Sequence, residues 1–251
     1  MQLKNNYYWF QSAISPQICK EIIDLGNSRI AEELAKGNSV EGTTKGRKER
    51  GSMGDDAITI ADTPPCDTEV GAKLYFRDSQ VAWLEDQWIY DLVMPFIDKA
   101  NRLAGWKWDI SGTESFQFTK YESPNGFYGW HKDGGSDWNA VYKRYIHGVS
   151  LDPLEDGKIP TGAGYGIHNN MIGKIRKISM TLNLNSPEDY EGGDLKFDFG
   201  ISNPSRYHIC EEIRPQGSLI VFPSFLDHCV TPVTKGTRYS LVLWTLGAPW
   251  R

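Results

Sequence analysis

The run Ser218-Leu219-Ile220-Val221-Phe222, followed by the turn Pro223-Ser224-Phe225, is a short apolar strand with a well-marked end. Runs of the same kind, separated by Gly, Pro, Asn and Asp, cover residues 114–121, 178–184, 194–199 and 239–246. Short β-rich segments punctuated by turn residues are typical of all-β architectures. A double-sheet jelly roll, or double-stranded β-helix, suits this pattern and can hold a metal and a small molecule between its sheets. We therefore expect a mainly β core over residues 106–251.

Two helices are expected before this core. Ser15-Pro16 has the form of an N-cap followed by proline at the first helical position, and apolar residues recur at helical spacing through residues 16–35. A second apolar stripe predicts a helix over residues 79–103, with a kink at Pro95. The predicted fold class is thus α+β, mainly β, with N-terminal supporting helices in residues 1–105.

The length of 251 residues fits one domain, residues 1–251. Within it, residues 134–175 form a Gly-, Asn- and Asp-containing insertion that is a candidate lid or substrate-binding loop. The charged cluster Arg47 to Arg50 falls in an expected loop. A solvated charge run is the simpler interpretation of that cluster, and contact with an acidic partner is the alternative.

The composition is that of an ordinary globular protein, with 39% hydrophobic and 24% charged residues. A net charge of -5 offers no basic face for sequence-independent binding of nucleic acid, which makes nucleic acid a weaker candidate partner. The four cysteines lack metal-knuckle spacing and are expected to be thiols. Because the sequence has neither a signal-peptide core nor an apolar run of membrane-spanning length, we expect a cytoplasmic protein without a membrane partner.

His131-Lys132-Asp133 carries two metal-ligand types at positions i and i+2, which share one face of a strand. His228 follows the apolar run and the proline turn and is the candidate third ligand. Two histidines and one carboxylate leave coordination positions open, as in non-haem iron(II) oxygenases. The alternative is that His131 and Asp133 only satisfy local hydrogen bonds near a turn. His147, His168 and His208 are expected to be loop or surface histidines rather than ligands.

Arg238 begins the apolar run of residues 239–246, with Ser240 on the same strand face. A guanidinium in this place could bind the distal carboxylate of 2-oxoglutarate through two hydrogen bonds, and Ser240 could donate another. The alternative is a surface arginine at the entrance of a strand.

Three segments resemble the prolyl 4-hydroxylase-like 2-oxoglutarate oxygenases, especially their PKHD-type branch. The first is residues 121–133, Tyr-Glu-Ser-Pro-Asn-Gly-Phe-Tyr-Gly-Trp-His-Lys-Asp, where a tyrosine lies ten residues before the first histidine. The second comprises residues 176–185 and the Gly-Gly turn Glu191-Gly192-Gly193-Asp194-Leu195. The third runs from Gly217 through His228 to Arg238. The resemblance covers about residues 75–248.

The resemblance implies a role for each matching position. His131, Asp133 and His228 would hold iron(II), and Arg238 would anchor 2-oxoglutarate. Tyr121 would donate a hydrogen bond to the co-substrate, with Gln117 and Thr181 as neighbours. Ascorbate is a candidate accessory reductant. Arginine rather than the lysine of animal collagen-type enzymes at position 238 favours the PKHD-type branch.

The expected function is that of a 2-oxoglutarate- and iron(II)-dependent dioxygenase acting on a protein or peptide substrate, with prolyl hydroxylation as the first hypothesis. The same chemistry on a nucleobase or a small metabolite is the second. A jelly-roll binding module without catalytic activity is the third, and it belongs to a different class. Tyr128 and Trp130, which flank the metal motif, either contact substrate or pack against the sheet.

Overall fold

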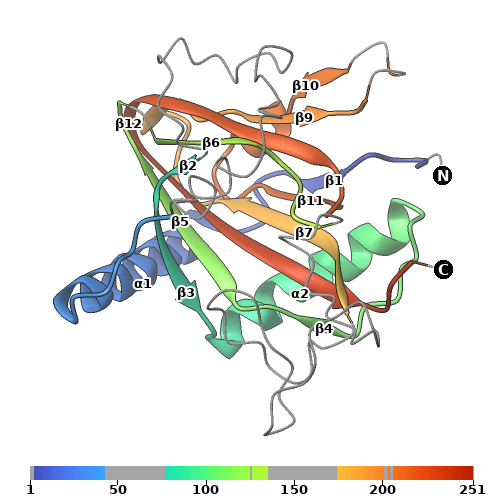
Figure 1. Cartoon of the computed structure of the whole chain (residues 1–251), viewed down its shortest axis with the longest axis horizontal. Coiled ribbons are helices and arrows are strands. Elements are labelled where there is room, and N and C mark those ends of the chain that lie inside the picture. The colour runs from blue at the N-terminus through green and yellow to red at the C-terminus, as the bar shows by residue number, and fades with distance from the viewer. Residues whose placement is uncertain are drawn as a thin grey trace, which may run out of the picture.

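The computed structural model describes residues 3–42, 77–124, 126–134, 174–200, 203 and 206–250. Two long helices and a set of antiparallel strands make up this part of the chain (Figure 1). The helices are α1 (Pro16–Ala35) and α2 (Gln87–Leu103), and a 3₁₀ helix spans Glu211–Ile213. The strands are β1 (Tyr8–Phe10), β2 (Arg77–Asp78), β3 (Gln80–Leu84), β4 (Gly112–Thr113), β5 (Phe116–Glu122), β6 (Gly126–His131), β7 (Ile175–Asn183), β8 (Tyr190–Gly192), β9 (Leu195–Asp198), β10 (Tyr207–Ile209), β11 (Leu219–Pro223) and β12 (Asp227–Gly247).

The strands form two antiparallel sheets that share β12. The larger sheet has the order β1-β11-β7-β12-β5-β3, and β4 also pairs with β12. In the smaller sheet, β12 pairs with β6, β8 and β9, while β2 extends β6 and β10 extends β9. Two sheets joined by strands that pass from one to the other are the architecture of a jelly roll. The predicted mainly β fold class is confirmed.

Strand β12 changes sheets near Gly236. Its residues up to Gly236 pair with the smaller sheet, and those from Thr237 onward pair with β5 and β7. Gly236 has a positive φ of 74°, and a Cβ atom there would collide with the carbonyl oxygen of Asp189. A side chain at this bend is therefore excluded by both backbone conformation and space. The bend lets one strand carry residues of both sheets.

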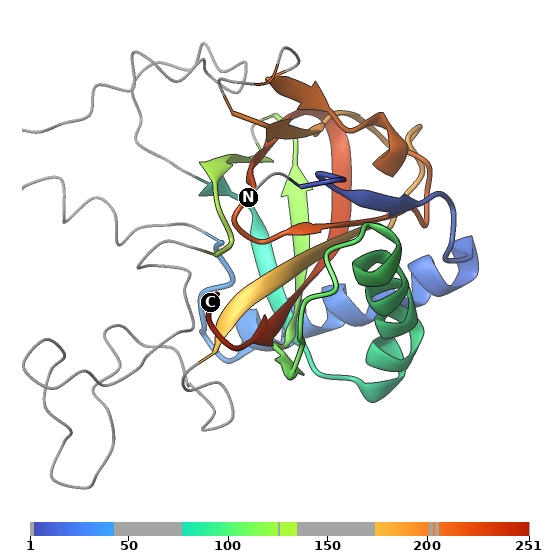
Figure 2. The ribbon, with the colours of Figure 1, turned by 90° about the vertical axis from the view of Figure 1, so that its right-hand side faces the viewer.

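Both helices lie on one side of the larger sheet (Figure 2). Ser15 caps α1 by accepting a hydrogen bond from the Ile18 backbone N–H at 3.4 Å, and Pro16 occupies the first helical position. The helix-facing side chains of the sheet are apolar and fully buried, among them Phe116, Phe118 and Leu241. Burial of this apolar surface stabilises the contact between the helices and the sheet.

The opposite face of the larger sheet, called the inner face here, is turned toward the smaller sheet. Its side chains alternate in sequence with the helix-facing ones, and many are polar yet buried: Gln117, Thr119, Ser179, Thr181, Asn183, Arg238 and Ser240. The register confirms that they share one face, because Arg238 lies opposite Tyr121 and Ser240 lies opposite Thr119. Burying a polar group costs free energy unless it forms hydrogen bonds to the protein or to a ligand. We therefore expect a ligand-binding site on this face.

The helix predicted over residues 16–35 is confirmed, but the helix predicted over residues 79–103 is wrong in its first part. Residues 80–84 form β3, which pairs with the edge of β5, and α2 begins at Gln87. Pairing with β5 supplies the backbone hydrogen bonds that a helix would have supplied, so tertiary context outweighs the apolar stripe. Pro95 lies inside α2.

Three further expectations concern the loops, the cysteines and the absence of a membrane-spanning segment. The Arg47 to Arg50 cluster, Cys66 and nearly all of the insertion at residues 134–175 lie outside the described residues. Cys19, Cys210 and Cys229 are buried thiols, as expected. Neither α1 nor α2 combines the length and the apolarity that crossing a membrane requires.

Candidate metal centre and co-substrate site

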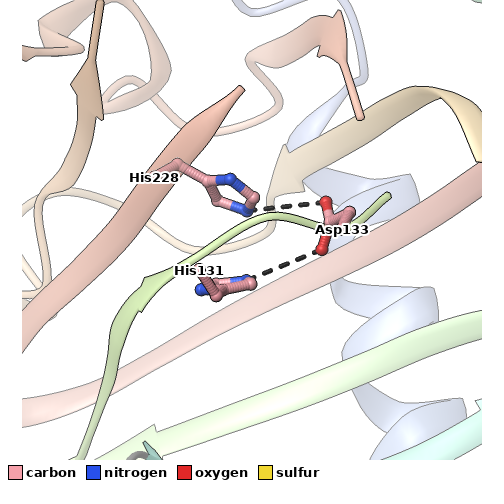
Figure 3. A group of neighbouring side chains, drawn as sticks. All are labelled: His131, Asp133 and His228. Atoms are coloured by element: carbon pink, nitrogen blue, oxygen red, sulfur yellow. Dashed lines mark ion pairs between the residues drawn. The ribbon is translucent and has the colours of Figure 1, made fainter. Parts of the chain in front are cut away.

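Cross-strand register brings His131 and His228 together. His131 is the last residue of β6, and His228, the second residue of β12, lies directly opposite it. Asp133 comes two residues after His131, and its carboxylate points between the two imidazoles (Figure 3). One potential ligand atom from each residue lies within 4.8 Å of the other two. The three sequence-predicted metal ligands therefore form one cluster.

Hydrogen bonds to the backbone orient both imidazoles. Nδ1 of His131 lies 2.8 Å from the carbonyl oxygen of Gly129, and Nδ1 of His228 lies 2.9 Å from that of Leu226. A carbonyl only accepts, so each Nδ1 carries the proton and each Nε2 keeps its lone pair. The Nε2 atoms face Asp133, at 3.6 Å from Oδ1 for His131 and 3.5 Å from Oδ2 for His228. All three side chains present ligand atoms to one point.

The electrostatics of the cluster favour the protonation states that bind a metal. Burial and the neighbouring His131 lower the pKa of His228 to about 4, which keeps its imidazole neutral at pH 7. Burial alone would raise the pKa of the Asp133 carboxyl, but the adjacent histidines and Arg176 outweigh it and hold that pKa below its usual range. The site thus offers two neutral nitrogens and one carboxylate.

Asp133 does not lie on a strand, contrary to the expectation for the His-Lys-Asp motif. Strand β6 ends at His131, and Asp133 lies in a bend whose backbone is held from outside. Arg176 Nη1 donates to the Asp133 carbonyl at 3.1 Å, and the Gly134 N–H donates to the Ser224 carbonyl at 2.7 Å. These bonds replace the strand pairing that would otherwise fix the carboxylate.

Arg176 is fixed by Glu114, and sequence reasoning missed both residues. Their side chains form a bidentate pair with two N–O distances of 2.6 Å, and the guanidinium lies 3.9 Å from the centre of the Trp244 ring. The role of Arg176 could not be predicted because of a β-bulge in β7. Thr245 of β12 pairs with Ile178, but the next residue, Leu246, pairs with Arg176. The shifted register turns Arg176 to the inner face, where strict alternation would have placed it toward the helices. No local sequence signal identifies that bulge.

Arg238 lies on the inner face with its guanidinium buried. The Cζ atom is 5.5 Å from the centre of the Tyr121 ring. A Cβ atom added at Gly193 would lie 2.8 Å from Arg238 Cδ, so the second glycine of the Gly-Gly turn leaves room for this side chain. Nη1 is buried and has no hydrogen-bond partner among the described residues. A buried guanidinium nitrogen that no protein group of this part of the chain satisfies is suited to bind an anion.

The other predicted co-substrate residues occupy the same face with different surroundings. Ser240 is buried two residues after Arg238 on β12. Thr181 lies on β7, opposite Val242. Gln117 lies near the start of β5, before Tyr121, and its Oε1 accepts a hydrogen bond from Arg77 at 2.9 Å. Tyr121 therefore lies opposite Arg238 on the neighbouring strand, and Ser240 lies two residues after it on the same strand. Gln117 instead contacts Arg77, which the sequence did not predict.

Of the remaining candidates, only Tyr128 contacts the metal cluster among the residues that the structure describes. His208 is on β10, where its Nε2 is 2.8 Å from the Tyr7 hydroxyl oxygen. His147 and His168 are outside the described residues. Tyr128 stacks on His131 with ring centres 3.6 Å apart, while Trp130 packs near Tyr207 at 5.7 Å. Of these two flanking aromatics, Tyr128 is the one in contact with a candidate ligand.

The residues present fit iron(II) and 2-oxoglutarate. Two imidazole nitrogens and one carboxylate from a single cluster are a donor set suited to a non-haem iron, with coordination positions left for other ligands. The unpaired nitrogen of Arg238 suits the distal carboxylate of a small dianion. Both observations concern side chains that are buried, where charge interactions are strong.

Comparisons with known proteins agree with this arrangement. The sequence model of the 2OG-Fe(II) oxygenase superfamily matches residues 116–246. A PKHD-type hydroxylase of Picosynechococcus sp. is 36% identical over 109 residues, covering 42% of this chain and 47% of that protein. The chain thus spans about half the length of the curated relatives it matches.

Solved structures share the fold at low sequence identity. A viral collagen prolyl hydroxylase of Paramecium Bursaria Chlorella virus-1, in a 2OG complex, superposes with a TM-score of 0.53 at 16% identity, covering 97% of each chain. A prolyl hydroxylase of Trichoplax adhaerens, in complex with a hypoxia inducible factor peptide fragment, gives 0.52 at 16% identity over 96% of this chain and 83% of that one. Because the superfamily model covers more than half of the sequence and includes every residue of the metal cluster, the chain belongs to the 2OG-Fe(II) oxygenase superfamily.

Proposed function

We propose that this protein is an iron(II)- and 2-oxoglutarate-dependent dioxygenase that hydroxylates a prolyl residue in a peptide or protein. The observation that carries the proposal is the presence of two complementary sites in one fold. A buried His-Asp-His cluster can hold the metal, and an arginine on the same strand as His228 has a buried nitrogen with no partner among the described residues. A binding module without catalytic activity has no use for both.

Each residue has a distinct task in this proposal. His131, Asp133 and His228 hold iron(II), and the backbone bonds of the two imidazoles keep their Nε2 atoms aimed at it. Arg238 binds the distal carboxylate of 2-oxoglutarate, with Tyr121 and Ser240 as further donors. When bound, the iron and 2-oxoglutarate supply dioxygen activation and the oxidative decarboxylation that yields succinate and carbon dioxide. Arg176 and Glu114 position Asp133 through its backbone carbonyl.

The relatives support the prolyl substrate. The curated relatives are named PKHD-type hydroxylases, and the structural neighbours are prolyl hydroxylases, one of them in complex with a peptide. The metal cluster and Arg238 would serve any hydroxylation, so a nucleobase or a small metabolite is the alternative substrate to be tested. Ascorbate, as a reductant that keeps iron in its divalent state, is proposed as an accessory.

The direct test is succinate release from 2-oxoglutarate by protein loaded anaerobically with iron(II) and then exposed to air. The reaction is run with proline-containing peptides, with matched peptides in which alanine replaces proline, and with nucleosides. Asp133→Ala serves as the inactive variant and His208→Gln as the matched control outside the site. Omission of ascorbate from parallel reactions measures its contribution.

We expect succinate release that is stimulated by proline-containing peptides and lost in Asp133→Ala. Mass spectrometry should then show a gain of one oxygen atom on proline. Stimulation by nucleosides alone would replace the prolyl substrate by the nucleobase alternative. Failure to bind either iron or 2-oxoglutarate would leave the binding module as the better interpretation.

A further inference from the structure

Arg77 is a second buried guanidinium at the site, and it precedes the segment that the superfamily model matches. It begins β2, and its side chain is only 7% exposed. Nε donates to the Ser79 hydroxyl at 2.8 Å, and Nη2 donates to Gln117 Oε1 at 2.9 Å and to Thr119 Oγ1 at 3.2 Å. All of these acceptors are neutral, so hydrogen bonds hold the guanidinium in place without neutralising its charge.

Arg77 bridges the two sheets beside the metal cluster. Gln117 and Thr119 belong to the inner face of the larger sheet, whereas β2 pairs with β6 of the smaller sheet. The Arg77 Cζ atom lies 4.5 Å from the centre of the Tyr128 ring, and that ring stacks on His131. A single aromatic ring thus links this cation to a candidate metal ligand.

No carboxylate of the described residues forms an ion pair with Arg77. Partial burial of the adjacent Asp78 carboxyl, together with the neighbouring Glu41 and Glu122, raises its pKa. Nε and Nη2 of Arg77 make its hydrogen bonds to the described residues, and Nη1 makes none with them. Nη1 is therefore the nitrogen that is left to donate to a ligand group.

The charges of the occupied site leave Arg77 unbalanced. Glu114 neutralises Arg176. Iron(II) and the 2-oxoglutarate dianion carry equal and opposite charges, and Asp133 offsets the charge of one further guanidinium, that of Arg238. Among these groups of the described residues one positive charge remains, on the largely buried Arg77, where an uncompensated charge is costly. A substrate that brings one negative charge would balance it.

We infer that Arg77 binds a carboxylate of the substrate, so that the preferred peptides carry an acidic side chain next to the reacting proline or end in a free carboxyl group there. The inference rests on the proposed function and specifies its substrate class. Nη1 supplies the donor, and the bonds to Ser79, Gln117 and Thr119 hold the planar guanidinium in one orientation. Tyr128 separates the bound carboxylate from the metal ligands.

The test measures binding by titration calorimetry to protein loaded with nickel(II) and 2-oxoglutarate, because nickel occupies nitrogen and oxygen sites tightly. Two matched pairs of peptides are used: acetyl-Gly-Pro-Glu-Gly-amide against its Gln counterpart, and acetyl-Gly-Pro with a free carboxyl group against its amide. The pairs distinguish a side-chain carboxylate from a terminal one. Arg77→Met removes the charge, Arg77→Lys retains it, and Arg102→Met removes an exposed arginine of α2 as the matched control.

We expect the unmodified protein to bind the acidic member of at least one pair about tenfold or more tightly than the neutral member. Arg77→Met should abolish that preference, Arg77→Lys should retain part of it, and Arg102→Met should leave it intact. Equal binding of both members by the loaded protein, no binding of either, or an undiminished preference in Arg77→Met would overturn the inference. If Arg77→Met does not fold, the two peptide pairs on the unmodified protein and Arg77→Lys still decide.

Failure of the proposed function has a different signature in the same titrations. In that case the protein does not take up nickel or 2-oxoglutarate before any peptide is added. A protein that takes up both, yet does not distinguish acid from amide, retains the oxygenase site and refutes only the role of Arg77.

Discussion

The two faces of the larger sheet are built from alternate residues of the same strands, yet they differ in kind. The helix-facing side chains, such as Phe118 and Leu241, are apolar and fully buried against α1 and α2. The inner face presents Thr119, Arg238 and Ser240, which are buried and polar. Both faces are shielded from solvent, so exposure does not explain the difference.

The difference separates stability from function. Apolar burial on the helix-facing side contributes the free energy that holds the fold together. Polar groups on the inner face cost free energy when they are buried without partners. Arg238 Nη1 has none in the described part of the chain, and such a cost is tolerated where a ligand supplies the partner. Substitutions on the two faces should therefore produce opposite combinations of lost stability and lost function.

The largest effect is expected on the functional side, from loss of a metal ligand. His131→Ala or His228→Ala should lower 2-oxoglutarate turnover by about a thousandfold or more, because the metal loses one of its three protein ligands. Metal content after dialysis and succinate release are the measurements. His208→Gln should bind metal as the unmodified protein does, and equal loss in all three variants would contradict the choice of ligands.

The second effect tests the helix-facing side. Phe118→Ala should lower the free energy of unfolding by about 3–5 kcal/mol, as truncation of a buried aromatic residue does. The folded fraction should still bind 2-oxoglutarate with unchanged affinity. Chemical denaturation and a titration with 2-oxoglutarate separate the two outcomes.

Gly26 of α1 provides a companion to that experiment. A Cβ atom at this position would collide with the Phe118 ring, so Gly26→Ala should also destabilise the protein, by about 1–3 kcal/mol, through overpacking. If either variant were fully folded and yet bound 2-oxoglutarate more weakly, the helix-facing side would also contribute to ligand binding, and the two faces would not have separate roles.

The third effect concerns Arg238. Arg238→Met should weaken 2-oxoglutarate binding by about 10-fold to 100-fold, which corresponds to the free energy that a hydrogen bond to a charged group contributes. Its free energy of unfolding should stay level or rise, because the substitution removes a buried guanidinium whose Nη1 has no hydrogen-bond partner among the described residues. Arg238→Lys, which keeps the charge but not the planar fork, should fall between the two proteins in affinity. A destabilised Arg238→Met protein with normal affinity would show that Arg238 is structural.

The smallest effect distinguishes two hydroxyl groups on β12. Ser240→Ala should weaken 2-oxoglutarate binding about fivefold, as expected for one neutral hydrogen bond. The matched variant Thr245→Val deletes a hydroxyl that donates to the Ile178 carbonyl at 3.3 Å, and should lower stability without changing that affinity. If Thr245→Val weakened 2-oxoglutarate binding and Ser240→Ala did not, 2-oxoglutarate would bind on the helix-facing side of β12, contrary to the proposal.

Local patterns predicted much of this protein because they depend on neighbouring residues. The cap at Ser15-Pro16 and the helical spacing that follows gave the correct bounds of α1, and the turn-punctuated runs gave the correct fold class. The helix predicted from residue 79 was wrong at residues 80–84, where pairing with β5 decides the conformation. Pairing between distant strands leaves no mark in a local apolar stripe.

By itself the sequence determined which chemical groups are present: a His-Lys-Asp motif, a later histidine and an arginine before an apolar run. Together they predicted that the protein binds a metal and an anion. Only the tertiary structure decided how these groups meet. Register places His131 opposite His228, and a bulge turns Arg176 toward Asp133. The closure of two sheets leaves Arg77 beside Tyr128 without a counter-ion among the described residues. Residue type fixes what a side chain can bind, but register, bulges and sheet closure depend on contacts between distant segments.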